Sequence, residues 1–176
     1  MSNTRLINAD YGDWRWAGSA GAPPSSPAAL ADVNGTGILA WEFTNGESLH
    51  FPDQQLPHNY SEGTVLTPHL HWMPSTSATY TGTWTLEVIY HLSNVTGAAL
   101  SAKETTTIAF NSAMTAWQMQ TANFSATLTG TNRKISSILH ARLSLALSAG
   151  TSCFLNGLDA HYEIDRLGSA LITAKT

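Results

Sequence analysis

The sequence predicts an all-β protein, an antiparallel β-sandwich of the jelly-roll type that follows an extended N-terminal arm. Three observations support this fold class. Apolar and polar residues alternate in several stretches, turn residues such as Gly and Asn separate these stretches, and no stretch shows a convincing helical period. The alternating stretches number roughly seven or eight and are spaced by about 10–20 residues, a pattern typical of sandwiches and jelly rolls.

The arm is expected to comprise residues 1–36, because they show neither the strand period nor the helical period. Two tryptophans precede a tract rich in Gly, Ala, Ser and Pro, and proline cannot donate a hydrogen bond to a sheet. Exposed tryptophans usually find a surface, so the arm is expected to dock on a neighbouring molecule or to fold back on its own domain. The residues expected to make this contact are Trp14, Trp16, Pro23, Pro24 and Pro27.

The body is expected to be one jelly-roll domain, residues 37–176, because a chain of 176 residues suits a single domain. Its clearest strand covers residues 83–93, with Trp84, Leu86, Val88, Tyr90 and Leu92 facing the core. The leucines of residues 137–148 recur at every second position, which favours a strand over a helix. Residues 47–64 are interpreted as a long loop, and the remaining strands are expected at 38–43, 65–73, 105–110, 117–127 and 153–165.

The most distinctive strand is the one at residues 65–73, because it carries two histidines on one face. His69 and His71 point the same way, about 7 Å apart, while Leu66, Leu70 and Trp72 point the other way. A second polar stripe lies near the C-terminus and consists of Asp159, His161, Glu163 and Asp165. If the two stripes share a sheet face, they form one titratable patch, and His69, His71, Asp159, His161 and Glu163 are its candidate interface or metal residues.

Composition excludes several classes of function. Charged residues make up only 11% of the chain, its net charge is −4, and no Lys/Arg cluster is present to follow a nucleic-acid backbone. The start of the chain lacks a signal-peptide pattern, and no apolar run approaches the ~20 residues that span a bilayer. We therefore expect synthesis in a cytoplasm and no contact with nucleic acid or membrane. A surface with so few charges is a hint that neighbouring molecules cover it.

Catalytic interpretations have less support than structural ones. The H-x-H pair resembles the paired histidines of cupin enzymes, but the glutamate expected shortly after it is missing from residues 72–76. Hydrogen-bonded histidines therefore remain the favoured interpretation, and neither a metal nor another cofactor is predicted. The chain has no G-x-S-x-G motif and no glycine-rich phosphate loop, and its single cysteine, Cys153, is expected in the core. A carbohydrate platform would have to use the aromatic residues expected at the surface, Trp117 and Tyr60.

The chain resembles small virion structural proteins of tailed bacteriophages, of the jelly-roll head decoration or cement type. The resemblance covers residues 41–169 and is carried by the His-Leu-His-Trp strand, the Thr/Ser-rich middle and the ending Asp159-x-His161-Tyr162-Glu163-x-Asp165-x-x-Gly168-Ser169. It implies a jelly-roll subunit that self-associates, often as a trimer, and docks on the virion. It does not imply an enzyme or supply a catalytic residue.

The expected function is therefore that of a non-enzymatic subunit that stabilises a capsid. Its partners would be the major capsid protein and further copies of itself, and it would reside in the virion after assembly in the host cytoplasm. Histidines at a subunit interface would make assembly sensitive to pH near their ordinary pKa. The alternatives are a tail or fibre protein that binds carbohydrate and a cupin-like metal-binding enzyme.

Overall fold

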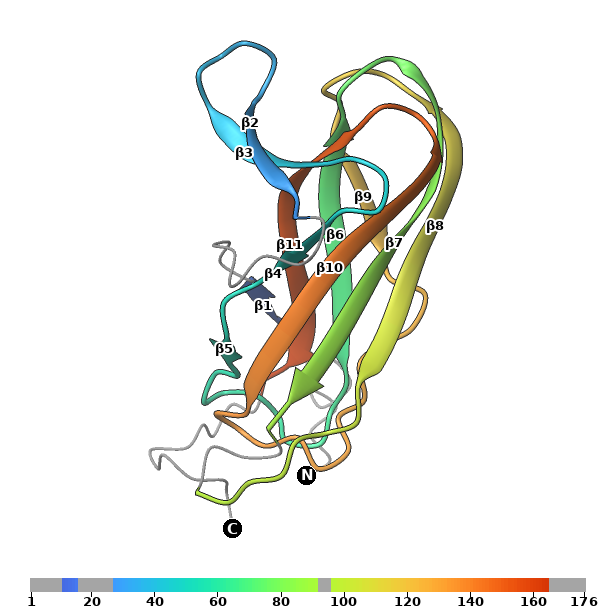
Figure 1. Ribbon diagram of the computed structural model, residues 1–176. Helices are drawn as coiled ribbons and strands as arrows, with labels where there is room; N and C mark the ends of the chain where they lie inside the picture. The colour runs from blue at the N-terminus through green and yellow to red at the C-terminus, as the bar shows by residue number, and fades with distance from the viewer. Residues whose placement is uncertain (1–10, 16–26, 92–95, 165–176) are drawn as a thin grey trace, which may run out of the picture.

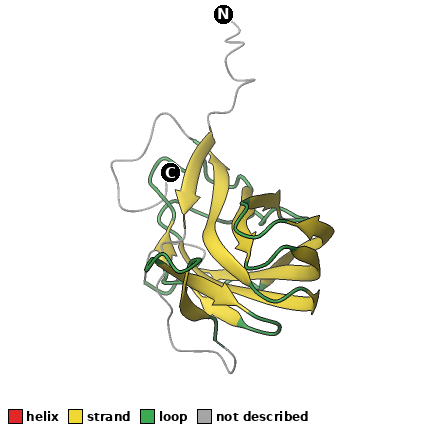
Figure 2. Cartoon of the chain, turned by 90° about the horizontal axis from the view of Figure 1, so that it is seen from above, coloured by secondary structure: helices red, strands yellow, loops and turns green. Residues whose placement is uncertain are grey.

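The computed structural model describes residues 11–15, 27–91 and 96–164, and for residues 11–15 it describes the backbone only. Figure 2 shows that this part of the chain is built from strands, turns and loops. Accordingly, none of these residues belongs to a helix long and apolar enough to cross a membrane.

The strands form two antiparallel sheets that pack face to face (Figure 1). One sheet has the order β2-β3-β11-β6-β9, with β1 also pairing with β11, and the other has the order β4-β10-β7-β8, with β5 also pairing with β10. The first sheet contains β1 (Tyr11–Arg15), β2 (Ala29–Asp32), β3 (Leu39–Phe43), β6 (Leu66–Pro74), β9 (Gln120–Asn123) and β11 (Cys153–Glu163). The second contains β4 (Ser48–His50), β5 (Gln54–Gln55), β7 (Ala78–Tyr90), β8 (Glu104–Met114) and β10 (Ile138–Ala149).

The strand order confirms the predicted jelly roll. Apart from β2 at the sheet edge and from β1 and β5, which lie off the main strand path, the two sheets are β3-β11-β6-β9 and β4-β10-β7-β8. These are eight antiparallel strands in two sheets, and strands that follow each other in the chain lie mostly in opposite sheets, as a doubly folded Greek key requires. The last strand, β11, therefore lies between β3 and β6, which come much earlier in the chain.

The core lies between the two sheets and is centred on aromatic residues. Trp84 of β7 is fully buried, with its ring 5.0 Å from Phe43 and 6.3 Å from Trp72, both in edge-on geometry. Leu86, Val88 and Tyr90 of β7, which were also predicted to face the core, are buried, and the predicted core residue Leu92 lies outside the described residues. Alternation along the strands thus identified the apolar faces that the two sheets bury against each other.

Two regions differ from the sequence prediction or extend it. The interval 47–64, interpreted as a loop, contains β4 and β5, which pair with β10. They are only three and two residues long, which is too short for an alternation of apolar and polar residues to be recognised.

The expected arm also contributes strands to the body. β1 pairs with β11, placing Trp14 opposite Ala160, and β2 pairs with β3. Pro27 forms a bridge with Ser48, whereas Trp16, Pro23 and Pro24 lie outside the described residues. The docking of these residues on a neighbour stays a prediction.

Candidate functional site

The polar patch predicted from the two stripes lies on the outer face of the first sheet. On β6, Leu66, Leu70 and Trp72 are buried in the core, so His69 and His71 stand on the opposite face. On β11, the core residues are Leu158, Ala160 and Tyr162, and the residues that alternate with them, including Asp159 and His161, therefore face outward. The two stripes share one face because β6 and β11 are direct neighbours in the sheet.

A β-bulge in β11 decides which face Asp159 occupies. The pairing with β6 shifts between Leu155 and Gly157, so that Asn156 is an extra residue without a partner in the register. Cys153 and Leu155 belong to the core before the bulge, and Leu158 belongs to it afterwards. If Asn156 were instead paired in a regular ladder, the alternation would continue from Leu155, and Gly157 and Asp159 would face the core.

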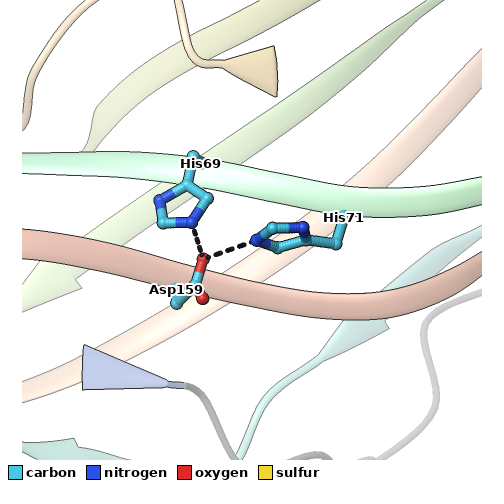
Figure 3. Close-up of side chains that lie close together, drawn as sticks. All are labelled: His69, His71 and Asp159. Carbon is cyan, nitrogen blue, oxygen red and sulfur yellow. Dashed lines mark ion pairs between the residues drawn. The ribbon is translucent and has the colours of Figure 1, made fainter. Parts of the chain in front are cut away.

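The register brings the carboxylate of Asp159 to both histidines. Asp159 is directly opposite His69, and His69 Nε2 lies 2.6 Å from Asp159 Oδ1. His71 Nε2 lies 3.6 Å from the same oxygen. Figure 3 shows the two rings turned toward this oxygen. His69 and Asp159 are buried at 7% and 3% exposure, and the His71 side chain is 24% exposed. Two imidazole nitrogens from β6 thus converge on one carboxylate oxygen from β11.

Further side chains hold the histidine rings in place. Thr121 of β9 is opposite His71 in the register, and its Oγ1 lies 3.0 Å from His71 Nδ1. The ring of His161 stacks on His69, with centroids 4.6 Å apart and planes 13° apart, while the rings of His69 and His71 meet at 72°. The structure therefore brings together four of the five predicted patch residues.

The fifth residue, Glu163, lies near the end of β11, and its backbone carbonyl accepts a hydrogen bond from the N–H of Ser61. Sequence reasoning missed Thr121, whose only signal was its place in a strand-forming segment. It also assigned Asp13 and Arg15 to an arm, although β1 places them opposite His161 and Asp159 in the register.

The donor atoms of the patch determine what it can bind. One ligand atom from each of His69, His71 and Asp159 lies within 4.8 Å of the other two, and among the described residues no other group of three or more His, Cys, Asp and Glu has this arrangement. Such a set can bind protons through the imidazoles, or a divalent ion through two nitrogens and one oxygen.

A second polar cluster lies on the other sheet and lines a hollow of about 480 Å³. Glu87 receives hydrogen bonds from Lys103, at 2.5 Å, and from Arg142, while His140 Nδ1 lies 2.5 Å from Asp53 Oδ1. Burial raises the pKa of Glu87, but the hydrogen bonds and positive charges of Lys103 and Arg142 outweigh it and hold that pKa below its usual range. These contacts form ion pairs on the sheet surface.

Two residues considered for chemistry on sequence grounds are buried. Burial raises the pKa of Cys153 to about 12, so its thiol stays protonated, as expected of a core residue. Tyr60, expected at the surface as a carbohydrate platform, is fully buried, which makes that interpretation of Tyr60 wrong. It occupies the core because it packs near Tyr162 and its hydroxyl donates to the carbonyl of Thr64. Trp117 is partly buried and packs against Phe154 at 5.3 Å.

An apolar groove of about 640 Å³ lies along the β2–β3 hairpin. Leu30, Ile38 and Leu39 line it and are 53%, 68% and 58% exposed. Figure 1 shows this hairpin extending away from the main part of the two sheets. Large apolar side chains are therefore gathered on a feature that projects from the body.

No protein-family model and no curated protein matches the chain. Among solved structures, a chain from the infectious bursal disease virus Gx strain has a TM-score of 0.45 at 10% identity, covering 93% of this chain and 35% of the viral one. The T13 particle of the same virus gives a TM-score of 0.41 at 11% identity, covering 85% of this chain and 39% of that one.

A carbohydrate-binding module, TmCBM61 in complex with β-1,4-galactotriose, has a TM-score of 0.41 at 14% identity, covering 87% of this chain and 88% of the module. The chain thus spans about a third of the length of the chains from the Gx and Gt strains of the virus, of which it covers 35% and 34%. Because all these TM-scores lie below 0.5, the fold assignment rests on the strand order.

Proposed function

We propose that the protein is a non-enzymatic virion structural protein, a capsid decoration or cement subunit of a tailed bacteriophage that associates with its own copies, as a trimer, and with the major capsid protein. The observation that carries the proposal is the apolar groove on the projecting β2–β3 hairpin. Leu30, Ile38 and Leu39 are each more than half exposed there, which leaves apolar area in water that a neighbouring subunit would remove.

Two features of the whole chain support the same function. Charged residues make up only 11% of the sequence, and a surface with few charges costs little to desolvate when it is covered by neighbours. The jelly-roll body gives the groove a rigid base, because β3 is hydrogen-bonded to β11, which lies within the sheet. The resemblance to phage decoration proteins supplies the identity of the partner.

The mechanism is linkage between binding and assembly. A subunit that binds the assembled shell more tightly than free capsid proteins stabilises the shell by an amount set by its concentration and affinity. A segment that reaches a neighbouring subunit raises the effective concentration of the body at the shell. Neither step requires turnover of a substrate.

The groove is tested by replacing Ile38 and Leu39 together with serine. Both side chains are exposed, so the fold should survive, while binding to empty capsids of the major capsid protein and self-association should fall by at least about tenfold, because apolar contact area is lost. Co-sedimentation measures the first quantity and light scattering after size-exclusion chromatography the second.

Leu100→Ser is the matched control, since Leu100 is 53% exposed but does not line the groove. It should leave both measurements unchanged. If the Ile38→Ser/Leu39→Ser variant bound capsids and self-associated as the wild type does, the groove would not be the binding surface. A wild-type chain that is monomeric and never sediments with capsids would contradict the function itself.

A further inference from the structure

We propose that His69, His71 and Asp159 bind one divalent first-row transition-metal ion, with Zn²⁺ as the ion best suited to two imidazoles and one carboxylate on the outer face of the sheet (Figure 3). The inference goes beyond the proposed capsid function and is independent of it. A metal here would join β6 to β11 whether or not the protein binds a shell.

The first argument is the position of His71. Its Nε2 lies 3.6 Å from Asp159 Oδ1, which is too far for a hydrogen bond, so a hydrogen bond does not account for the approach. Two ligands of one tetrahedral ion, each about 2.0–2.1 Å from it, are separated by about 3.3–3.5 Å. The distance between His71 and Asp159 therefore matches a pair of metal ligands better than a hydrogen-bonded pair.

The second argument is the partner on the other side of the same ring. Thr121 Oγ1 lies 3.0 Å from His71 Nδ1, so this nitrogen is engaged and Nε2 is the atom turned toward Asp159. Histidines that bind metals commonly hold the second ring nitrogen with an oxygen acceptor, which fixes the tautomer and the ring orientation. Here β9 supplies a hydroxyl oxygen that can accept from Nδ1–H when Nε2 binds the ion, and β6 and β11 supply the ligands.

The third argument is the rigidity of the donors. β6 and β11 are direct neighbours over nine register pairs, and His69 is paired with Asp159 in that register. His69 is further held by the stacked ring of His161, 4.6 Å away. To accept an ion, the 2.6 Å separation between His69 Nε2 and Asp159 Oδ1 must open by about 0.7 Å, which small rotations of the two side chains provide.

The coordination would be incomplete with protein ligands alone. Three donors leave at least one position of a tetrahedral ion for water or for an oxygen of a bound molecule. The His71 side chain is 24% exposed, whereas the side chains of His69 and Asp159 are 9% and 4% exposed, so the accessible position lies on the His71 side. Two imidazoles also argue against Mg²⁺ and Ca²⁺, which prefer oxygen ligands.

The test is calorimetric titration of Zn²⁺ into the full chain after removal of metals with a chelator. We expect one ion per chain and a rise in the melting temperature, since binding to the folded state stabilises it. His71→Ala and Asp159→Asn should each weaken binding by at least about tenfold, and Thr121→Val by about 10–100-fold. Co²⁺ should give the absorption spectrum of a low-symmetry site, and Mg²⁺ should give no heat.

His140→Ala is the matched control, because His140 also contacts an aspartate, Asp53, at 2.5 Å but forms no group of three donors with other residues that the structure describes. This variant should bind Zn²⁺ as the wild type does. His71 is partly exposed, so His71→Ala is the variant least expected to disturb folding, and circular dichroism checks that it is folded. No stoichiometric Zn²⁺ in the wild type, or equal binding by wild type, His71→Ala and Asp159→Asn, would overturn the proposal.

Discussion

At the scale of single residues, the ionisation of a side chain depends on how deeply the sheets bury it and on the groups beside it. Asp159 and Cys153 are both buried on β11, but Asp159 lies beside two imidazoles, whereas the surroundings of Cys153 raise its pKa to about 12. Glu87 is a third case, since its side chain is 12% exposed and contacts two cations that are more exposed than itself. Its charged form is therefore favoured in the folded protein.

Glu87→Gln should destabilise the protein by about 1 kcal/mol at neutral pH, a modest value because Lys103 and Arg142 are 60% and 43% exposed and water screens them. The pKa of Glu87 is lowered in the folded state, so its contribution is complete above the pKa of the unfolded chain. The contribution is lost as the pH falls through the lowered, folded-state pKa.

Urea unfolding of the wild type and of Glu87→Gln at neutral pH and at about pH 3 measures this difference. The free energies of unfolding should converge as the pH falls. An equal difference at both pH values would mean that the loss comes from packing and not from the charge of Glu87.

At the scale of elements, the bulge in β11 is what makes the polar patch possible. The extra residue, Asn156, lets Leu155 and Leu158 both face the core and leaves Asp159 outside with the histidines. In the sequence, apolar and polar residues alternate both before and after Asn156. The position at which the alternation changes phase is fixed by the pairing of β11 with β6.

Deletion of Asn156 and Gly157 together should prevent normal folding or destabilise the protein by more than about 4 kcal/mol. Regular alternation would then run from Leu155 directly to Leu158 and turn the carboxylate of Asp159 into the core, where an unpaired charge is expensive. Deletion of Asn156 alone would only remove the bulge and leave Asp159 outside. Circular dichroism and the dispersion of amide NMR signals report the outcome.

Asn156→Ala is the control for this deletion, because it keeps the number of residues and replaces an exposed side chain whose hydrogen bond is to Met119 sulfur at 3.4 Å. It should stay within about 0.5 kcal/mol of the wild type. If the double deletion were as stable as Asn156→Ala and kept its Zn²⁺ affinity, the phase of β11 at the bulge would not determine the face of Asp159.

At the scale of the whole molecule, the fold is closed by pairing the ends of the described chain. β1 and β11, the first and last described strands, are antiparallel neighbours, and β3 pairs with the start of β11. Such pairings between distant segments form late, because a long loop must close before they stabilise anything. The edge of β11 along Asp159 to Glu163 is covered by β1.

Removal of residues 1–26 tests whether the jelly roll is a domain without the N-terminal segment. Only β1, of the described strands, is lost, and the eight strands that define the jelly roll remain. We expect cooperative unfolding at a lower melting temperature and more self-association, because the deletion exposes unpaired backbone groups on β11. Thermal circular dichroism and size-exclusion chromatography measure these effects. A shortened chain without a cooperative transition would mean that the body cannot fold without this segment.

The sequence alone determined the fold class and the contents of the polar patch. Alternation in β6, β7 and β10 depends on local chemistry, because each strand has one face that must be buried, and this pattern is visible without knowing the strand's neighbours. The same alternation placed His69 and His71 on one face and Asp159 and His161 on another.

That these faces coincide follows from the folded structure and not from the sequence of either strand. Strand order placed β11 beside β6, the bulge set its phase, and β9 brought Thr121 to His71. It also turned parts of the expected arm and loop into β1, β2, β4 and β5. The physical reason is that pairing between strands far apart in the chain depends on how all the strands assemble into the two sheets. This assembly leaves no periodic pattern in the sequence of a single strand.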